Sequence, residues 1–255
     1  LYVLIVLIVC LPVFVAEMAL GRSAMASSLL APVKLGGKNW YPLGILFFIA
    51  PVGIASYYSV IMGWTADTLF HSLFFGLPKN LGEAENFFGS ISSGSSVLLG
   101  HLLSLLLTAF IVPSGIKKGI EKVTRYFMPI LFIILLGLVI WATTLSGALE
   151  GYKTFLFKFD FAELRNPQTI RNAFTQAFFS LSLGIGIMVT YASYLNKKSN
   201  LPKLSISVAT LDTLVGLMAG LITFPIVLTF GLSDAISEST VGALFISIPT
   251  GLGSY

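Results

Sequence analysis

The sequence predicts an all-α protein, a polytopic bundle of transmembrane helices. Of its 255 residues, 56% are hydrophobic and 10% are charged, whereas soluble domains carry roughly 25% charged residues. Four long stretches contain no charged residue at all, namely residues 39–66, 86–116, 126–149 and 172–196. A helix needs about 20 mostly apolar residues to cross a bilayer, and the strands of a membrane barrel do not give such long apolar runs.

Six stretches are long and apolar enough to cross the membrane. We expect spans within a single transmembrane domain, followed by an outer loop at residues 232–255. The expected spans are about residues 1–20, 41–70, 96–113, 126–146, 169–195 and 204–231. Glycine and serine are frequent between the second and third spans, which predicts a polar outer loop there. Pro167 stands where the fifth span should begin, a position that suits proline.

Basic residues alternate between the two sides of these spans. Ten of the 15 lysines and arginines lie in the connections 21–40, 114–125 and 196–203. The positive-inside rule therefore predicts that these three connections are cytoplasmic. Because residue 1 is a leucine inside an apolar run, we also expect the chain to be a fragment of a longer protein.

Several function classes lack their characteristic residues. Cys10 is the single cysteine, and His71 and His101 are far apart with no companions at ligand spacing. The sequence has no Gly-rich phosphate loop and no nucleophile elbow. We therefore expect neither an enzyme nor an organic cofactor. The basic residues lie between the spans, where topology explains them without nucleic acid.

Three carboxylates lie within the predicted spans, where each costs a few kcal/mol unless it has a partner. Glu17 is near the inner end of its span and can pair with Arg22. Asp67 is near an outer end, where it can reach water. Asp212 lies about eight residues inside its span, roughly 12 Å deep at the helical rise of 1.5 Å per residue. We therefore expect Asp212 to have a polar partner or a bound cation.

The fifth span contains an unusual segment, Phe178–Gly186, with two serines and two glycines. Both residue types weaken a helix, so a break is expected here. Freed carbonyls would suit a cation and the N-terminus of the second half-helix would suit an anion. Close packing of small residues is the alternative explanation. Tyr57, Tyr58 and Trp64 lie deep in the second span and suggest a polar cavity.

Four segments together resemble a known family. They are Leu11–Arg22, the Tyr57-Tyr58 pair followed by Trp64, Gly115–Lys122 and Phe178–Tyr194. Their order and spacing cover nearly the whole chain. The pattern resembles the neurotransmitter:sodium symporter family, and within it the bacterial amino-acid transporters of the leucine-transporter type. The resemblance to bacterial members implies a bacterial inner membrane.

The resemblance implies an inverted-repeat transporter fold in which this chain supplies the family's helices two to seven. Helix six of that fold is broken, and Phe178–Gly186 matches the break. The family's helices one and eight, which build the second sodium site, are not in the chain. Part of the expected site is therefore missing.

The resemblance also implies roles for individual residues. Positions matched to the substrate pocket are Ile54, Tyr58, Phe179, Ser182 and Ile185. Positions matched to a sodium site are Ser180 and Asp212, the latter often an asparagine in the family. The chloride-site equivalents are Tyr2, Gln176, Ser180 and Asp212, with Gly216 in place of a serine. Support of the helix break is expected from Glu17, Gly184 and Gly186.

These residues predict sodium-coupled symport of a small solute, most simply an amino acid, by alternating access. The carboxylate of Asp212 can supply the negative charge that chloride brings in other members, so we expect no chloride requirement. Two alternatives remain open. One is a channel or a non-transporting membrane scaffold, and the other is a symporter for amines.

Overall fold

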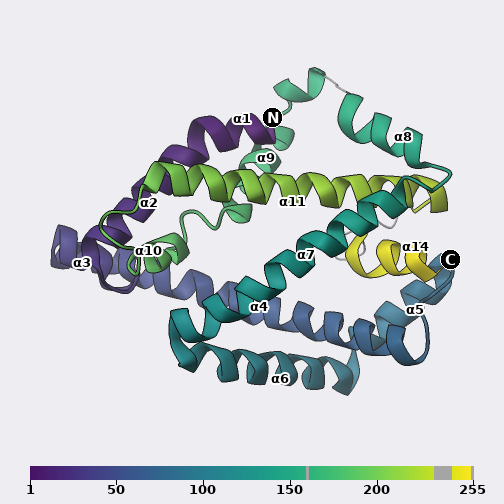
Figure 1. The fold of residues 1–255 in the computed structure, drawn as a ribbon, viewed down its shortest axis with the longest axis horizontal. Helices are drawn as coiled ribbons and strands as arrows, with labels where there is room; N and C mark the ends of the chain where they lie inside the picture. Colours follow the sequence, from purple (N-terminus) through teal and green to yellow (C-terminus); the bar gives the residue numbers. More distant parts are fainter. Residues whose placement is uncertain (159–160, 233–242, 254–255) are drawn as a thin grey trace. The chain divides into compact units, whose positions relative to one another are not determined.

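The computed structural model describes residues 1–158, 161–232 and 243–253. Within these residues every regular element is helical and none is a strand, which confirms the all-α prediction (Figure 1). Five helical segments are long and apolar enough to cross a membrane. They are Tyr2–Ala24, Lys38–Phe74, Val97–Ser114, Lys118–Ala142 and Leu201–Phe230.

The chain divides into two compact units. The first comprises Leu1–Ala55 and Phe159–Leu214, and the second comprises Ser56–Lys158 and Val215–Tyr255. Two long helices, α4 (Tyr41–Phe74) and α11 (Leu201–Phe230), each contribute residues to both units. The single transmembrane domain expected from the sequence therefore stays a prediction.

The first unit begins with a continuous helical rod. Its elements are α1 (Tyr2–Ile5), the π-helical turn η1 (Val6–Cys10) and α2 (Leu11–Ala24). The rod ends where Met25 adopts a left-handed conformation and its N–H bonds to the carbonyl of Gly21. The unit continues through α3 (Ala31–Gly36), the 3-10 turns η2 (Lys38–Trp40) and η6 (Ala162–Arg165), α9 (Pro167–Ser180) and α10 (Ile187–Ala192).

Every fourth residue of this rod faces the core of the first unit. Val6, Cys10, Phe14 and Met18 are all buried, as expected for one face of a helix. They pack against residues of α9, α10, α11 and the segment between α9 and α10, namely Ala177, Leu181, Leu183, Ala192, Leu201 and Ala209. This packing holds the rod against the elements that carry the candidate site.

The rod approaches α10 most closely at Gly21. A Cβ added to Gly21 would lie 2.1 Å from the carbonyl oxygen of Val189. We expect Gly21→Ala to lower the thermal unfolding midpoint of the detergent-solubilised protein, since such overpacking costs about 1–3 kcal/mol. Gly53→Ala is the control, because a Cβ at this helical glycine meets nothing within 4 Å. Equal midpoints for the two variants would contradict the close approach.

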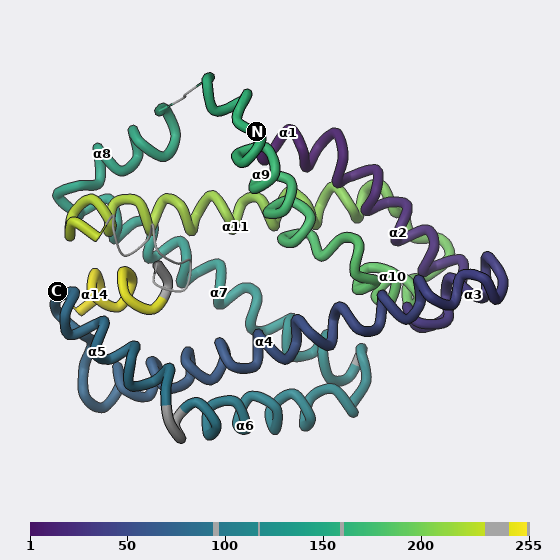
Figure 2. The backbone as a smooth tube through the Cα atoms, turned by 180° about the vertical axis from the view of Figure 1, so that it is seen from behind, coloured from purple at the N-terminus to yellow at the C-terminus, as the bar shows by residue number. Residues whose placement is uncertain are grey.

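In the second unit, α6 (Gly94–Ile111) lies alongside α4 (Figures 1 and 2). The two helices meet where Gly63 faces Gly100. Its other elements are α5 (Leu81–Ile91), η3 (Val112–Ser114), η4 (Ile116–Ile120), α7 (Glu121–Ala142), α8 (Ala148–Tyr152), η5 (Lys153–Phe157), η7 (Ala243–Ser247) and α14 (Ile248–Gly253). A buried cluster joins the end of α7 and α8 to α11 through Ala142, Leu145, Ala148, Ile222 and Ile226.

The predicted outer loop between the second and third spans contains a helix, α5, that the sequence does not predict. The Asn80 side chain accepts the N–H of Glu83 at 3.0 Å, and the Glu83 carboxylate accepts the N–H of Lys79 at 2.9 Å. This reciprocal cap starts the helix. The hydrogen bonds from the Lys79 backbone and the Asn80 side chain hold the pKa of Glu83 below its ordinary value.

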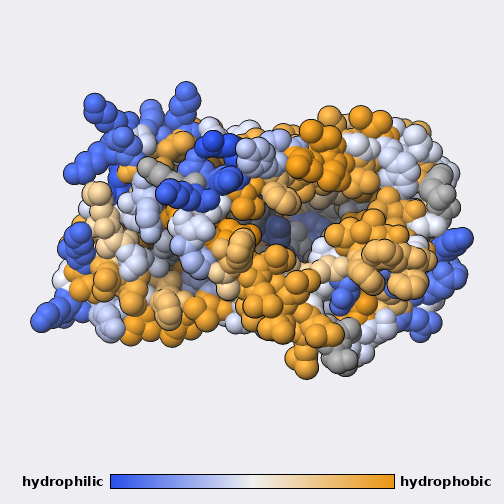
Figure 3. Space-filling view, turned by 60° about the horizontal axis from the view of Figure 1, so that its bottom comes forward, coloured by the Kyte–Doolittle hydropathy of each residue, from blue (hydrophilic) through white to orange (hydrophobic). Residues whose placement is uncertain are grey.

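The other predicted spans coincide with helices, except that α9 and α10 together occupy the fifth. Of the predicted outer loop 232–255, residues 243–253 form η7 and α14. Residues 233–242 and 254–255 lie outside the described part. Large hydrophobic side chains such as Phe48, Phe110 and Ile133 are exposed, and Figure 3 shows hydrophobic residues over much of the face drawn.

Candidate substrate and ion site

The helix over the fifth predicted span is interrupted in its middle. Helix α9 ends at Ser180 and α10 begins at Ile187. Between them the N–H of Ser182 turns back to the carbonyl of Phe179 at 3.0 Å, and that of Leu183 to Phe178 at 2.9 Å. The predicted broken helix is therefore confirmed.

The break has a backbone conformation that a helix cannot continue through. Ser182, Gly184 and Gly186 all have positive φ angles, of 54°, 79° and 77°. Positive φ is rare for any residue other than glycine, so Ser182 is held against its preference. The two leucines that flank Ser182, Leu181 and Leu183, are only 2% and 4% exposed. Their burial against the N-terminal rod fixes the unwound segment in place.

The carboxylate of Glu17 reaches the unwound segment from α2. Its Oε1 accepts the N–H of Gly184 at 2.6 Å across 167 residues of sequence. This replaces the helical bond that the Gly184 amide loses at the break. Arg22, which the spacing offered as a partner for Glu17, instead donates to the carbonyl of Ser199 at 2.7 Å. This contact is what a supporting role for Glu17 requires, and the role itself stays a prediction.

The two glycines of the break differ in their surroundings. A Cβ on Gly186 would lie 2.6 Å from the Cβ of Phe47, whereas one on Gly184 meets nothing within 4 Å. Both alanine variants suffer the strain of positive φ, about 1–3 kcal/mol. We expect only Gly186→Ala to add a clash. Its unfolding midpoint should therefore lie below that of Gly184→Ala, and the reverse order would contradict the packing described.

A polar cluster centred on Asp212 lies beside the C-terminal end of α9. The Ser180 hydroxyl donates to both carboxylate oxygens, at 2.8 and 2.7 Å. The Tyr2 hydroxyl donates to Oδ2 of Asp212 at 3.1 Å. All three side chains are half-buried. Three helices far apart in sequence, α1, α9 and α11, therefore bring their polar groups to one carboxylate.

The Asp212 cluster has the chemistry of a site for a small hard cation. Carboxylate and hydroxyl oxygens are the ligands that such cations prefer. The C-terminus of α9, which ends at Ser180, adds the negative end of a helix dipole. Gln176, the fourth chloride-site equivalent, is exposed one turn earlier on α9, and no hydrogen bond joins it to this cluster among the described residues.

The residues matched to the substrate pocket fall in both units. Phe179, Ser182 and Ile185 lie at the break in the first unit, where Phe179 is 49% exposed. Ile54 lies on the part of α4 that belongs to the first unit. Tyr58 belongs to the second unit and packs edge-to-face on Tyr57, with ring centroids 5.9 Å apart.

Two contacts near the site could not be predicted from the sequence. The Ser205 hydroxyl approaches the Met18 sulfur at 3.2 Å inside the core, and Arg22 binds the backbone at Ser199. Neither pair lies at a sequence spacing that would indicate a contact.

Asp67 has a buried Oδ2 with no hydrogen-bond partner among the described residues.

Comparisons with known proteins identify the family of this chain. A family model described as the sodium:neurotransmitter symporter family matches residues 83–241, more than half of the chain. The chain belongs to the sodium:neurotransmitter symporter family. The family is one of transporters, so the chain is not part of an enzyme. With its long apolar helices it is part of a multi-pass membrane protein.

Two relatives in this family are named sodium-dependent transporters. YhdH of Bacillus subtilis is 34% identical over 258 residues, which cover 98% of this chain and 56% of YhdH. MJ1319 of Methanocaldococcus jannaschii is 36% identical over 269 residues, covering 98% of this chain and 54% of MJ1319. The chain therefore spans about half the length of the curated relatives it matches.

One solved structure is closely similar to this chain. The crystal structure of MhsT in complex with L-phenylalanine matches this chain with a TM-score of 0.90 and 36% sequence identity. The match covers 100% of this chain and 57% of the MhsT chain. The transporter fold expected from the sequence is thus confirmed.

Proposed function

We propose that the transporter containing this chain carries an amino acid into the cell together with sodium, by alternating access and without a chloride requirement. The observation that carries the proposal is the Asp212 carboxylate, held by the hydroxyls of Ser180 and Tyr2 beside the broken helix. Family membership and the names of the relatives support sodium as the coupled ion.

Sodium would bind at Asp212. Oxygens of its carboxylate and of the Ser180 hydroxyl are available at the point where α9 ends. Carbonyls of the unwound segment would complete the coordination, as at other helix breaks in transporters. A charged ligand favours a cation more than the neutral asparagine side chain found at this position in many members.

Chloride independence follows from the same carboxylate. Tyr2, Ser180 and Asp212 match positions around the chloride site of chloride-dependent relatives. Here the hydroxyls of Tyr2 and Ser180 both donate to Asp212, so a fixed negative charge accepts the hydrogen bonds that a chloride ion would otherwise receive. No additional anion is then needed to balance sodium in a medium of low dielectric constant.

An amino acid is the proposed substrate. MhsT, whose fold matches this chain, was solved with L-phenylalanine. The family resemblance assigns the substrate carboxylate to the Tyr58 hydroxyl, and Phe179, Ser182, Ile185 and Ile54 are the other positions matched to the pocket.

The test measures uptake by the full product of the gene, reconstituted in liposomes. Labelled amino acids are offered with an inward sodium gradient or an equal potassium gradient. Saturable uptake of at least one amino acid under sodium alone is the expected result. Saturable uptake of amines but of no amino acid would show that the substrate is an amine. No saturable uptake of either class would favour the channel or scaffold alternative.

Tyr58→Phe tests the substrate contact. Loss of one hydrogen bond to a charged carboxylate costs about 1.5–3 kcal/mol, so KM for the transported amino acid should rise on the order of tenfold to a hundredfold. Tyr57→Phe is the matched control because it removes the same hydroxyl from the neighbouring exposed ring. Equal effects of the two substitutions on KM would contradict the assignment.

A further inference from the structure

A hollow lined by basic residues lies where η4 meets the start of α7. Lys118, Lys122, Arg125 and Tyr126 line it, and all four side chains are exposed. Residues spaced by three or four positions share a helix face, which brings the three cations together. From this hollow we propose a binding site for the headgroup phosphate of an anionic phospholipid.

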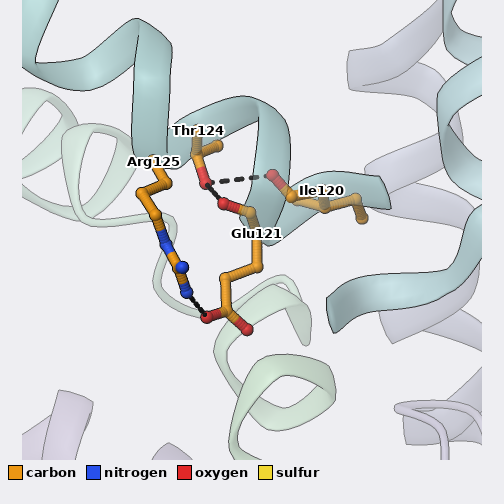
Figure 4. Close-up of polar contacts among 4 residues, drawn as sticks. All are labelled: Ile120, Glu121, Thr124 and Arg125. Atoms are coloured by element: carbon orange, nitrogen blue, oxygen red, sulfur yellow. Dashed lines mark hydrogen bonds and ion pairs between the residues drawn. The ribbon is translucent and has the colours of Figure 1, made fainter. Parts of the chain in front are cut away.

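The charge balance of the hollow favours an anion. Arg125 forms an ion pair with Glu121 at 2.7 Å, on the turn before it (Figure 4). Lys118 and Lys122 have no ion-pair partner among the described residues. Two uncompensated ammonium groups therefore remain, and they can donate hydrogen bonds to phosphate oxygens while Arg125 uses its remaining N–H groups.

The position of the hollow along α7 favours a lipid over a free phosphate. The connection 114–125 is predicted to be cytoplasmic, and the apolar helical segment Lys118–Ala142 begins within it. None of the apolar window of this span is buried, and Phe127, Ile130 and Ile133 are exposed. In the proposed site, acyl chains lie along α7 while the headgroup occupies the hollow. Tyr126 is the first residue of the predicted span 126–146, and aromatic side chains are common at such membrane interfaces.

The topology rule alone explains why basic residues are present in this connection, but it does not explain why they line one hollow. A second basic group, Lys197, Lys198 and Lys203, lies in a connection also predicted to be cytoplasmic and is exposed as well. It carries the same charge of three and therefore provides a matched control.

The test is native mass spectrometry of the full gene product in detergent, with phosphatidylglycerol or phosphatidylcholine added at equal concentration. We expect more bound phosphatidylglycerol than phosphatidylcholine. The triple variant Lys118→Gln, Lys122→Gln, Arg125→Gln should lower phosphatidylglycerol binding on the order of tenfold or more. Lys197→Gln, Lys198→Gln, Lys203→Gln should change it by less than about twofold. Glu121→Gln should increase it, because it removes the opposing charge.

Three outcomes would overturn the proposal. They are equal loss in both triple variants, no preference for phosphatidylglycerol, and equally tight binding of glycerol phosphate, which lacks acyl chains. If the first triple variant does not fold, the double variant Lys118→Gln, Lys122→Gln is measured in its place. This double variant keeps the Arg125–Glu121 pair. Binding equal to that of the unmodified protein in this folded double variant would equally overturn the site.

Discussion

Replacing Asp212 with asparagine is expected to weaken sodium-driven uptake severely in chloride-free medium. The asparagine side chain keeps the shape and one acceptor oxygen for the hydroxyls of Ser180 and Tyr2, but it carries no charge. Unit charges about 4 Å apart attract by about 4 kcal/mol at an effective dielectric constant of about 20. The apparent sodium affinity, measured from uptake against sodium concentration, should therefore fall on the order of 100-fold or more.

Chloride provides the sharper comparison for this variant. If Asp212 stands in for the anion, chloride should partly restore uptake by Asp212→Asn while leaving the unmodified protein unchanged. Asp67→Asn is the matched control, since it makes the same substitution in another helix and should keep uptake near the original rate. An Asp212→Asn variant that still transports at the original sodium affinity would show that this carboxylate does not bind sodium.

Removal of the Glu17 carboxylate is expected to have the second largest effect. Its Oε1 is the acceptor for the Gly184 N–H at the break. A hydrogen bond to a charged acceptor contributes about 1.5–3 kcal/mol, and the amide of Gly184 would be left without it. Glu17→Ala should therefore lower the uptake rate at least about tenfold, measured at saturating sodium and substrate.

The glutamine variant separates the charge from the hydrogen bond. Glu17→Gln can still accept from Gly184, so its uptake should lie between that of the unmodified protein and that of Glu17→Ala. Glu150→Ala is a suitable control because Glu150 is exposed on α8. Equal uptake by Glu17→Ala and the unmodified protein would show that the unwound segment keeps its shape without this contact.

The helices and the break follow from local features of the sequence. Long uncharged stretches dictate the spans because lipid leaves the backbone no other means of satisfying its polar groups. The pattern of serines and glycines in Phe178–Gly186 predicts the interruption because those residues weaken a helix. The depth of Asp212 in its span predicts that it has a polar partner, and Ser180 and Tyr2 are the partners that the structure provides.

The contacts between distant segments could not be predicted from the sequence in the same way. Glu17 and Gly184 are 167 residues apart, and Arg22 and Ser199 are 177 apart. Local spacing favoured a Glu17–Arg22 pair, because residues near one another on a helix are the only partners that spacing can identify. Family resemblance, not spacing, indicated Glu17 as a support of the break. The sequence does not predict helix α5 because the residues around its N-cap, Asn80, have a composition typical of loops.

The most direct test of the central claim is the dependence of sodium-driven uptake on chloride in the unmodified protein. Uptake of the identified amino acid is measured with the sodium gradient fixed and chloride replaced by gluconate on both sides of the liposome membrane. A carboxylate at Asp212 that replaces the anion predicts the same initial rate with and without chloride. Loss of uptake in gluconate, recovered on adding chloride, would contradict the account.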